Sequence, residues 1–337
     1  MLTFAAGIAI RIAFVVLYRP AFLGITDAGS YLNAAHSGLF TNVYDPAGYP
    51  LLIRVLHAVY AHLSLLIVVQ HGLGVATAAL LYVVVRRVTE SPLLALIPAG
   101  IVLLDGYGLW VEHAPITETL FEFLVVAALT LGLYAAERTR WLLVGEGVLI
   151  AAAALARPVG LILLPIVAVW IFGTRSGRAG SRAVAVGTLI APTFGLVAGY
   201  VLVQRADTGF TGITRDSGRV LYARAAMFAD CSRLSPPAGT AVLCETTPAS
   251  QRGSFNQYVT GFPDHGHAVT TTMRSISPAW RVFGPPPAGN QKLLAFGLAA
   301  IIHQPLDYLS HVANDFHYYW ADHHIAFFNA GAQVDPT

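Results

Sequence analysis

Residues 64–87 read SLLIVVQHGLGVATAALLYVVVRR, a predominantly apolar run that ends in two arginines. Spanning a hydrocarbon core takes about 20 helical residues, so a run of this length and composition predicts a membrane-spanning helix. The whole chain has the same character, because 55% of its 337 residues are hydrophobic and only 11% are charged. An ordinary soluble domain carries roughly a quarter charged residues. The sequence therefore predicts an integral membrane protein.

Six further apolar stretches flank this run, at residues 2–18, 92–110, 119–136, 141–156, 158–173 and 183–203. The first has no small-residue cleavage site after it, so we expect a membrane helix and not a cleaved signal peptide. The stretches at 141–156 and 158–173 are short and could form one long helix broken at Arg157-Pro158, because proline removes a backbone donor. We expect an all-α, multi-pass domain of about seven transmembrane helices over residues 1–204.

Arginines in short loops predict the orientation, because cytoplasmic loops are enriched in basic residues. They fall in alternate connections of the seven-span arrangement, at Arg86 and Arg87, Arg138 and Arg140, and Arg175, Arg178 and Arg182. The amino terminus is then cytoplasmic in a cell-membrane protein. The segments predicted to face outward are the first outer loop at residues 19–63, the segment 111–118, the turn around residue 157 and everything after residue 204.

From about residue 205 the content of Gly, Pro, Ser and Thr rises and no convincing span follows. We expect residues 205–337 to form a soluble extracytoplasmic region, either mixed α/β or irregular. The apolar run at 293–302 suits a buried or interfacial helix better than a span. Cys231 and Cys244 both lie in this region, and an outer compartment favours a disulfide between them over two free thiols.

The first outer loop carries the strongest candidate site, in the segments TDAGSYLNAA at 26–35 and YDPAGYPLL at 44–52. Asp27 and Tyr31 are four residues apart and would share one face of a helix. A carboxylate at the membrane surface suits a catalytic base acting on a lipid-linked substrate. Asp27 could instead be only the N-cap of that helix. Tyr49-Pro50 could equally mark a simple break before an interfacial helix at 51–62.

Other polar groups are expected at the same membrane face, in WVEHAPITE at 110–118. Ionisable groups at membrane depth are costly, so Glu112, His113 and Glu118 suggest function, although a solvated interfacial loop explains them too. Arg157 is the first candidate for a phosphate ligand and Arg11 the second, because the guanidinium fork matches phosphate oxygens. Arg11 could instead extend to the interface or pair with a buried carboxylate.

The Asp-x-x-x-Tyr pattern at 27–31, GYPLL at 48–52 and ARPVGL at 156–161 resemble those of the GT-C glycosyltransferases. The nearest resemblance is to the transferases that use polyprenyl-phosphate sugars, such as protein O-mannosyltransferases and aminoarabinose transferases. It extends over residues 1 to about 205.

The resemblance implies transfer of a sugar from a polyprenyl-phosphate donor to a glycan, lipid or protein acceptor at the outer face. It implies Asp27 as the general base that deprotonates the acceptor hydroxyl, and Glu118 as an acidic residue of the site. It favours a metal-independent enzyme without cofactor. We place in the substrate-binding set Tyr31, Tyr49, His113, Arg157 and Arg11.

Two histidine clusters have the composition of metal-ligand sets, Asp264-His265-Gly266-His267 and Asp322-His323-His324. Spacing places no third ligand for either, so we predict no metal site. The aromatic segment at 314–320 suits a juxtamembrane belt or a sugar-stacking surface equally. A net charge of +2 without a basic patch argues against nucleic acid as a partner.

GT-C proteins have further spans after the outer loop, so the resemblance implies either a shortened member or part of a longer protein.

Two other functional classes also remain open. A transporter or flippase of lipid-linked sugars would place its ionisable residues near the bilayer midplane, often in repeated halves. A non-catalytic assembly subunit is the third possibility.

Overall fold

The computed structural model describes residues 2–23, 26–135, 140–261 and 277–318. All regular structure in these ranges is helical, which confirms the all-α prediction there. Strands, which were one expectation for the region after residue 204, do not occur in its described part. The chain divides into two compact units between Ile213 and Thr214, close to the expected boundary.

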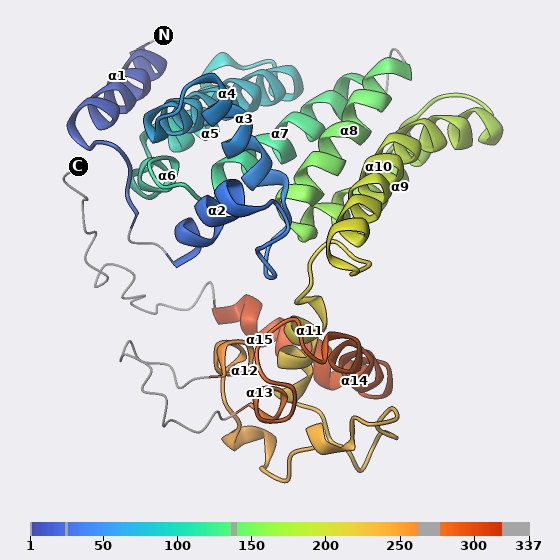
Figure 1. The fold of residues 1–337 in the computed structure, drawn as a ribbon. Helices are drawn as coiled ribbons and strands as arrows, with labels where there is room; N and C mark the ends of the chain where they lie inside the picture. Colours follow the sequence, from blue (N-terminus) through green and yellow to red (C-terminus); the bar gives the residue numbers. More distant parts are fainter. Residues whose placement is uncertain (1, 24–25, 136–139, 262–276, 319–337) are drawn as a thin grey trace. The chain divides into compact units, whose positions relative to one another are not determined.

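The first unit is built of helices joined by short connections (Figure 1). In chain order they are α1 (Leu2–Leu17), α2 (Thr26–Ser37), α3 (Gly48–Val59), α4 (Leu63–Thr89), α5 (Pro92–Leu104), α6 (Gly106–Glu112), α7 (Glu118–Ala135), α8 (Arg140–Ala156), the 3-10 helix η1 (Pro158–Ile162), α9 (Leu163–Thr174) and α10 (Ala179–Thr208). Each of the seven apolar stretches coincides with one or two of these helices. α2 and α3 lie within residues 19–63, the segment that the sequence predicts as the first outer loop.

Two of these helices, α4 and α10, are each long and apolar enough to cross a membrane. The pair α5 and α6 reaches that length together but is bent by 55°. α1 and the segment Pro158–Thr174 are apolar but shorter. Two to four candidate spans among the described residues are consistent with a membrane protein. The number seven and the orientation stay predictions.

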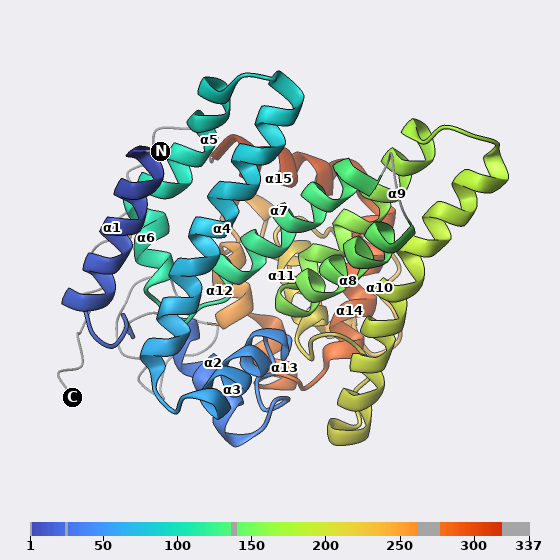
Figure 2. The same ribbon diagram turned by 90° about the horizontal axis from the view of Figure 1, so that it is seen from above.

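The long helices pack side by side in the order α5, α4, α7, α8, α10, as Figure 2 shows from above. In lipid, helix association depends on close van der Waals packing, which small residues permit. α8 has this character: its buried residues include Gly147, Ala151 and Ala154. The hydroxyl of Thr193 on α10 donates to the carbonyl oxygen of Gly147 over 2.9 Å and fixes the two helices against each other.

Two helix breaks position the candidate site. α8 ends at Ala156, directly before Arg157-Pro158, and the chain continues as the 3-10 helix η1. Proline lacks the backbone donor that would continue α8, so the expected break occurs where it was predicted. The second break lies between α5 and α6, where the carboxylate of Asp105 accepts a hydrogen bond from the backbone N–H of Gly108 over 2.7 Å. This cap starts α6 in a new direction.

The second unit is a small helical assembly. Its elements are α11 (Ser217–Ala226), η2 (Ala241–Leu243), η3 (Ala249–Gln251), α12 (Phe255–Thr260), α13 (Pro278–Phe283), α14 (Asn290–His303) and α15 (Pro305–Tyr318). Tyr222 of α11 and Phe296 of α14 lie in its buried core. Leu293, Phe296 and Ala300 are spaced by three and four residues, so α14 buries one face, as expected for 293–302.

A disulfide closes the segment that follows α11. It joins Cys231 and Cys244, the predicted pair, with 5.9 Å between their Cα atoms. α14 and α15 reach the length of a span only if taken together, and they are bent by 98°. Because α14 packs in the core of this unit, we describe the pair as a broken helix of that core.

Candidate active site

α2 presents the carboxylate of Asp27. The helix begins at Thr26, so Asp27 lies in its first turn instead of preceding it as an N-cap would. A carboxylate in the first turn interacts favourably with the helix dipole. The residue is exposed, and Ser30 donates a hydrogen bond to its backbone oxygen over 2.8 Å. Asp27 can therefore support the helix start and still meet a substrate.

Tyr31 lies one turn after Asp27 and is buried, with 2% of its surface exposed. Burial is the main cause that raises the pKa of its phenol, and the carboxylates of Asp45, Glu118 and Asp27 raise it further. The Arg157 guanidinium acts in the opposite direction. Electrostatic influence falls with distance. Charged groups from four separate segments therefore surround one phenol.

Asp45 is held in place by its own loop. The side-chain amide of Asn42 donates to Oδ2 of Asp45 over 3.1 Å. The Asn42 carbonyl oxygen accepts the backbone N–H groups of Tyr44 and Asp45 at 2.9 and 3.3 Å, which forms an Asx turn. Burial raises the pKa of the Asp45 carboxyl and the nearby Asp27 adds to this, whereas the bond from Asn42 and the charge of Arg157 lower it.

Arg157 and Glu118 form an ion pair at the same place. Nη1 of Arg157 lies 2.5 Å from Oε1 of Glu118, and the two side chains are 40% and 41% exposed. The pair joins the residue after α8 to the first residue of α7. Nε and Nη2 of Arg157 have no protein partner among the described residues. Two N–H directions of the guanidinium fork thus remain available to an anion.

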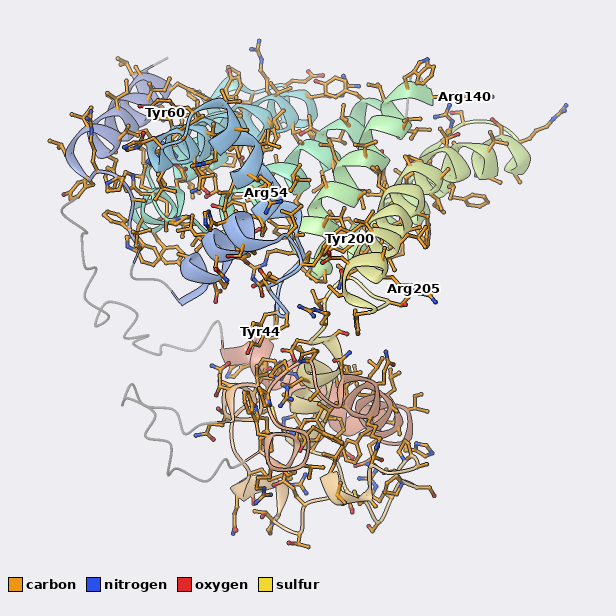
Figure 3. The ribbon with its side chains drawn as sticks, in the orientation of Figure 1. Tyr44, Arg54, Tyr60, Arg140, Tyr200 and Arg205 are labelled. Atoms are coloured by element: carbon orange, nitrogen blue, oxygen red, sulfur yellow. A yellow bond between two sulfur atoms is a disulfide. The ribbon has the colours of Figure 1, made fainter. Side chains whose placement is uncertain are left out.

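Gly48 lets the first outer loop reach the end of α8. A Cβ atom on Gly48 would overlap the backbone carbonyl group of Leu155, so no other residue permits this approach. Next to it, the backbone N–H of Ala47 donates to the hydroxyl of Tyr200 on α10 over 3.0 Å. Figure 3 shows Tyr200 on α10 and Tyr44 on the loop before α3. The loop is therefore anchored to two of the long helices.

Tyr49 supports the site from beneath. It is fully buried, its ring meets that of Tyr31 edge to face with 5.1 Å between centroids, and its hydroxyl is hydrogen-bonded to the side chain of Gln70. The amide of Gln70 donates in turn to the backbone oxygens of Glu112 and Ala114 at 2.9 and 2.7 Å. Tyr49, which we placed in the substrate-binding set, thus fixes Tyr31 instead of facing a substrate in this structure.

Arg11 lies in a separate buried network. Its Nε and Nη2 donate to the two carboxylate oxygens of Glu112 at 2.8 and 2.6 Å. Its Nη1 and Nη2 also donate to the backbone oxygens of Gly7, Leu103 and Val102. These contacts use all five N–H donors of a guanidinium. The alternative of a pair with a buried carboxylate therefore describes Arg11, and we leave it out of the proposed substrate-binding set.

His113 belongs to the same network. Its Nδ1 lies 3.0 Å from Nε2 of His71, and its Nε2 is hydrogen-bonded to the backbone oxygen of Tyr18. Nδ1 of His71 lies 2.7 Å from the carboxylate of Glu112. Both ring nitrogens of His113 are engaged and the residue is buried. His113 is thus positioned to join α1, α4 and α6, and we leave it out of the substrate-binding set as well.

The structure gathers Asp27, Tyr31, Glu118 and Arg157 from the residues predicted from sequence. It adds Asp45, which stands in the loop motif at 44–52 without an assigned role, and Asn42, which lies just before that motif. The only sequence signal for Asp45 was its place in the same loop, directly before the Pro-Ala-Gly-Tyr-Pro segment. Gln70 and His71 lie within the apolar run at 64–87 that predicts a membrane span. Two polar residues in the middle of a membrane helix were the signal that could have singled them out.

The predicted histidine clusters at 264–267 and 322–324 lie outside the described residues, as does Trp320 at the end of the aromatic segment. Asp315 of that segment forms an ion pair with Arg224 on α11. In the ranges that the structure describes, no group of three or more His, Cys, Asp or Glu is arranged to hold a metal ion.

No protein-family model, curated protein or solved structure matches the chain. The site must therefore be interpreted from its own chemistry. It combines an exposed carboxylate, a second carboxylate whose pKa is raised, and a half-exposed arginine. Such a group can accept a proton from a hydroxyl and bind an anion beside it.

Proposed function

We propose that the protein is a membrane glycosyltransferase of the GT-C type. It would move a sugar from a polyprenyl-phosphate donor to the hydroxyl of a glycan, lipid or protein acceptor at the outer membrane face. The observation that carries the proposal is the convergence of Asp27, Asp45, Glu118 and Arg157 around Tyr31. These residues come from α2, the following loop, α7 and the end of α8.

In the proposed reaction, the carboxylate of Asp27 takes the proton of the acceptor hydroxyl. The acceptor oxygen forms a bond to the anomeric carbon while the bond from that carbon to the phosphate oxygen breaks. The electron pair leaves with the polyprenyl phosphate, whose charge the free N–H groups of Arg157 would bind. Glu118 would orient Arg157 through the 2.5 Å contact. General-base catalysis of this kind contributes about 10²–10⁴-fold to a rate.

The test uses the purified full-length protein with undecaprenyl- or decaprenyl-phosphate sugars and follows the release of polyprenyl phosphate. Asp27→Asn should insert and fold normally but lose turnover by about 10²-fold or more. Asp207→Asn is the matched control, because Asp207 is an exposed aspartate on α10 away from the cluster. Turnover retained in Asp27→Asn would refute the role of the base.

One observation favours the alternative of a transporter or flippase for lipid-linked sugars. Glu146 of α8 is fully buried, and within the described part of the chain neither of its carboxylate oxygens has a hydrogen-bond partner. A buried ionisable group within a membrane helix is a functional candidate by default. Movement of intact polyprenyl-phosphate sugar across vesicles, lost in Glu146→Gln and unaffected by Asp27→Asn, would favour this alternative over the enzyme.

A further inference from the structure

A cavity of about 440 Å³ lies between α2, α3 and the first turn of α4. None of Asp27, Tyr31, Asp45, Glu118 and Arg157 lines it. It is therefore separate from the candidate active site, although α2 contributes to both. The chemistry of its walls identifies the class of ligand that it fits.

The walls are of two kinds. The apolar part is formed mainly by Leu32, Ile53, Leu56, Leu63 and Leu66. The polar part is basic or donates hydrogen bonds, and consists of His36, Arg54, His57 and His62. No carboxylate lines the cavity. A ligand that fits both parts has an anionic head and an apolar body.

The side chain of Arg54 is held by one hydrogen bond, and the rest of its guanidinium group is accessible to a ligand. Its Nε donates to the backbone oxygen of Ala35 over 2.8 Å, which ties α3 to α2. Nη1 and Nη2 have no protein partner in the described ranges. The residue is exposed, and Figure 3 shows it on α3. A guanidinium held in this way presents parallel N–H groups, the geometry that matches phosphate oxygens.

The cavity lies at the N-terminal end of a candidate membrane span. This span is α4, which is long and apolar enough to cross a membrane and begins at Leu63 in the cavity wall. α3 exposes Leu51, Val55 and Val59, which are 49%, 53% and 77% exposed. Their four-residue spacing puts them on one face of the helix. An amphipathic helix with such an apolar face lies in the membrane interface.

We propose that this cavity binds the phosphate headgroup of an anionic membrane lipid. Nη1 and Nη2 of Arg54 donate to the phosphate oxygens, and the imidazole N–H groups of His36 and His57 complete the polar part. The first carbons of the lipid chains lie over the leucine and isoleucine wall. The site does not depend on glycosyl transfer, because it shares no side chain with the candidate active site.

Native mass spectrometry of the full-length protein, released from detergent micelles, tests the proposal. The probes are palmitoyl-oleoyl phosphatidylglycerol, the matching phosphatidylcholine and inorganic phosphate. Wild type should retain phosphatidylglycerol in preference to phosphatidylcholine. Arg54→Gln should reduce that preference by about tenfold or more, because the loss of even one charge-assisted hydrogen bond gives a factor of about ten. Arg205→Gln, which removes an exposed arginine that does not line the cavity, should keep the preference.

Two further variants keep the proposal open to refutation should Arg54→Gln fail to fold. Arg54→Lys retains the charge and should retain part of the preference, and the double variant His36→Gln with His57→Gln should reduce it. An equal loss in Arg205→Gln would show that lipid preference is a general property of the basic residues and would overturn the site. Full displacement of lipid by millimolar inorganic phosphate would mean a soluble-anion site and would overturn the lipid assignment.

Discussion

Nη1 of Arg157 lies 2.5 Å from Oε1 of Glu118, so an ion pair joins the end of α8 to the first turn of α7 across 39 residues of sequence. The pair is exposed enough to meet a substrate. Both members affect the pKa of Tyr31, and Arg157 also lowers the pKa of Asp45. Loss of the pair should therefore affect substrate binding more than stability.

Glu118→Gln removes the charge and keeps the size of the side chain. Exposed ion pairs contribute about 0–1 kcal/mol, so the unfolding temperature should change little. Arg157 loses the partner that orients it, so the KM for the polyprenyl-phosphate sugar should rise roughly tenfold, or about 1.4 kcal/mol, with a smaller change in kcat. Steady-state kinetics measure both constants. A lower KM would mean that Glu118 competes with the phosphate, contrary to the orienting role.

The raised pKa of Asp45 predicts that activity and stability depend on pH in opposite directions. Burial raises the pKa of its carboxyl in the folded protein. At a pH between the pKa of the unfolded chain and that of the folded protein, the folded protein therefore holds a proton that the unfolded chain has released. The stabilising contribution of this proton is complete below the unfolded pKa and is lost as pH rises through the folded pKa. If turnover requires the ionised carboxylate, activity should rise over the same interval.

Two variants separate Asp45 from other titrating groups. Asn42→Ala removes a hydrogen bond that lowers the pKa of Asp45, so the acid limb of the pH–rate profile should move to higher pH. Asp45→Asn should move the limb to lower pH, or abolish turnover if the carboxylate is essential. An acid limb unchanged in both variants would show that another group controls it.

The sequence was informative where the physical signal is local. Apolar stretches predicted the helices, Arg157-Pro158 predicted the end of α8, and the four-residue spacing of Asp27 and Tyr31 predicted their proximity. Partners far apart in sequence leave no such signal. From the sequence, Arg11 is therefore a possible phosphate ligand. The structure shows that its partner is Glu112, 101 residues away. For Asp45 the sequence shows only its place in the loop, because burial and the turn at Asn42 give it its properties.

The Arg11–Glu112 pair predicts a large effect on stability. Both side chains are nearly fully buried, and breaking a buried ion pair by removing one member costs about 3–5 kcal/mol. In Arg11→Met the Glu112 carboxylate keeps its contact with His71, and in Glu112→Gln the Arg11 guanidinium loses its carboxylate. Arg11→Met and Glu112→Gln should therefore each lower the unfolding temperature strongly. The double variant should lose less than the sum of the two, because it leaves no unpaired charge. Thermal unfolding in detergent measures the cycle, and additive losses would contradict the coupling.

The Gly74→Ala variant tests the Arg11–Glu112 contact by a change in packing that alters no charge. It lies on α4 beside Glu112, and a Cβ atom there would overlap the carboxylate oxygen that Arg11 binds. Gly74→Ala should push Glu112 away from Arg11 and destabilise the protein, although alanine is the better helix former by about 1 kcal/mol. Gly72 lies on the same helix with open space around its own Cβ position, so Gly72→Ala keeps the propensity gain without the clash. We therefore expect the unfolding temperature to fall in Gly74→Ala and to stay level or rise in Gly72→Ala. Equal shifts in the two variants would show that Glu112 can move without loss, and that its ion pair with Arg11 does not fix α1 against α6.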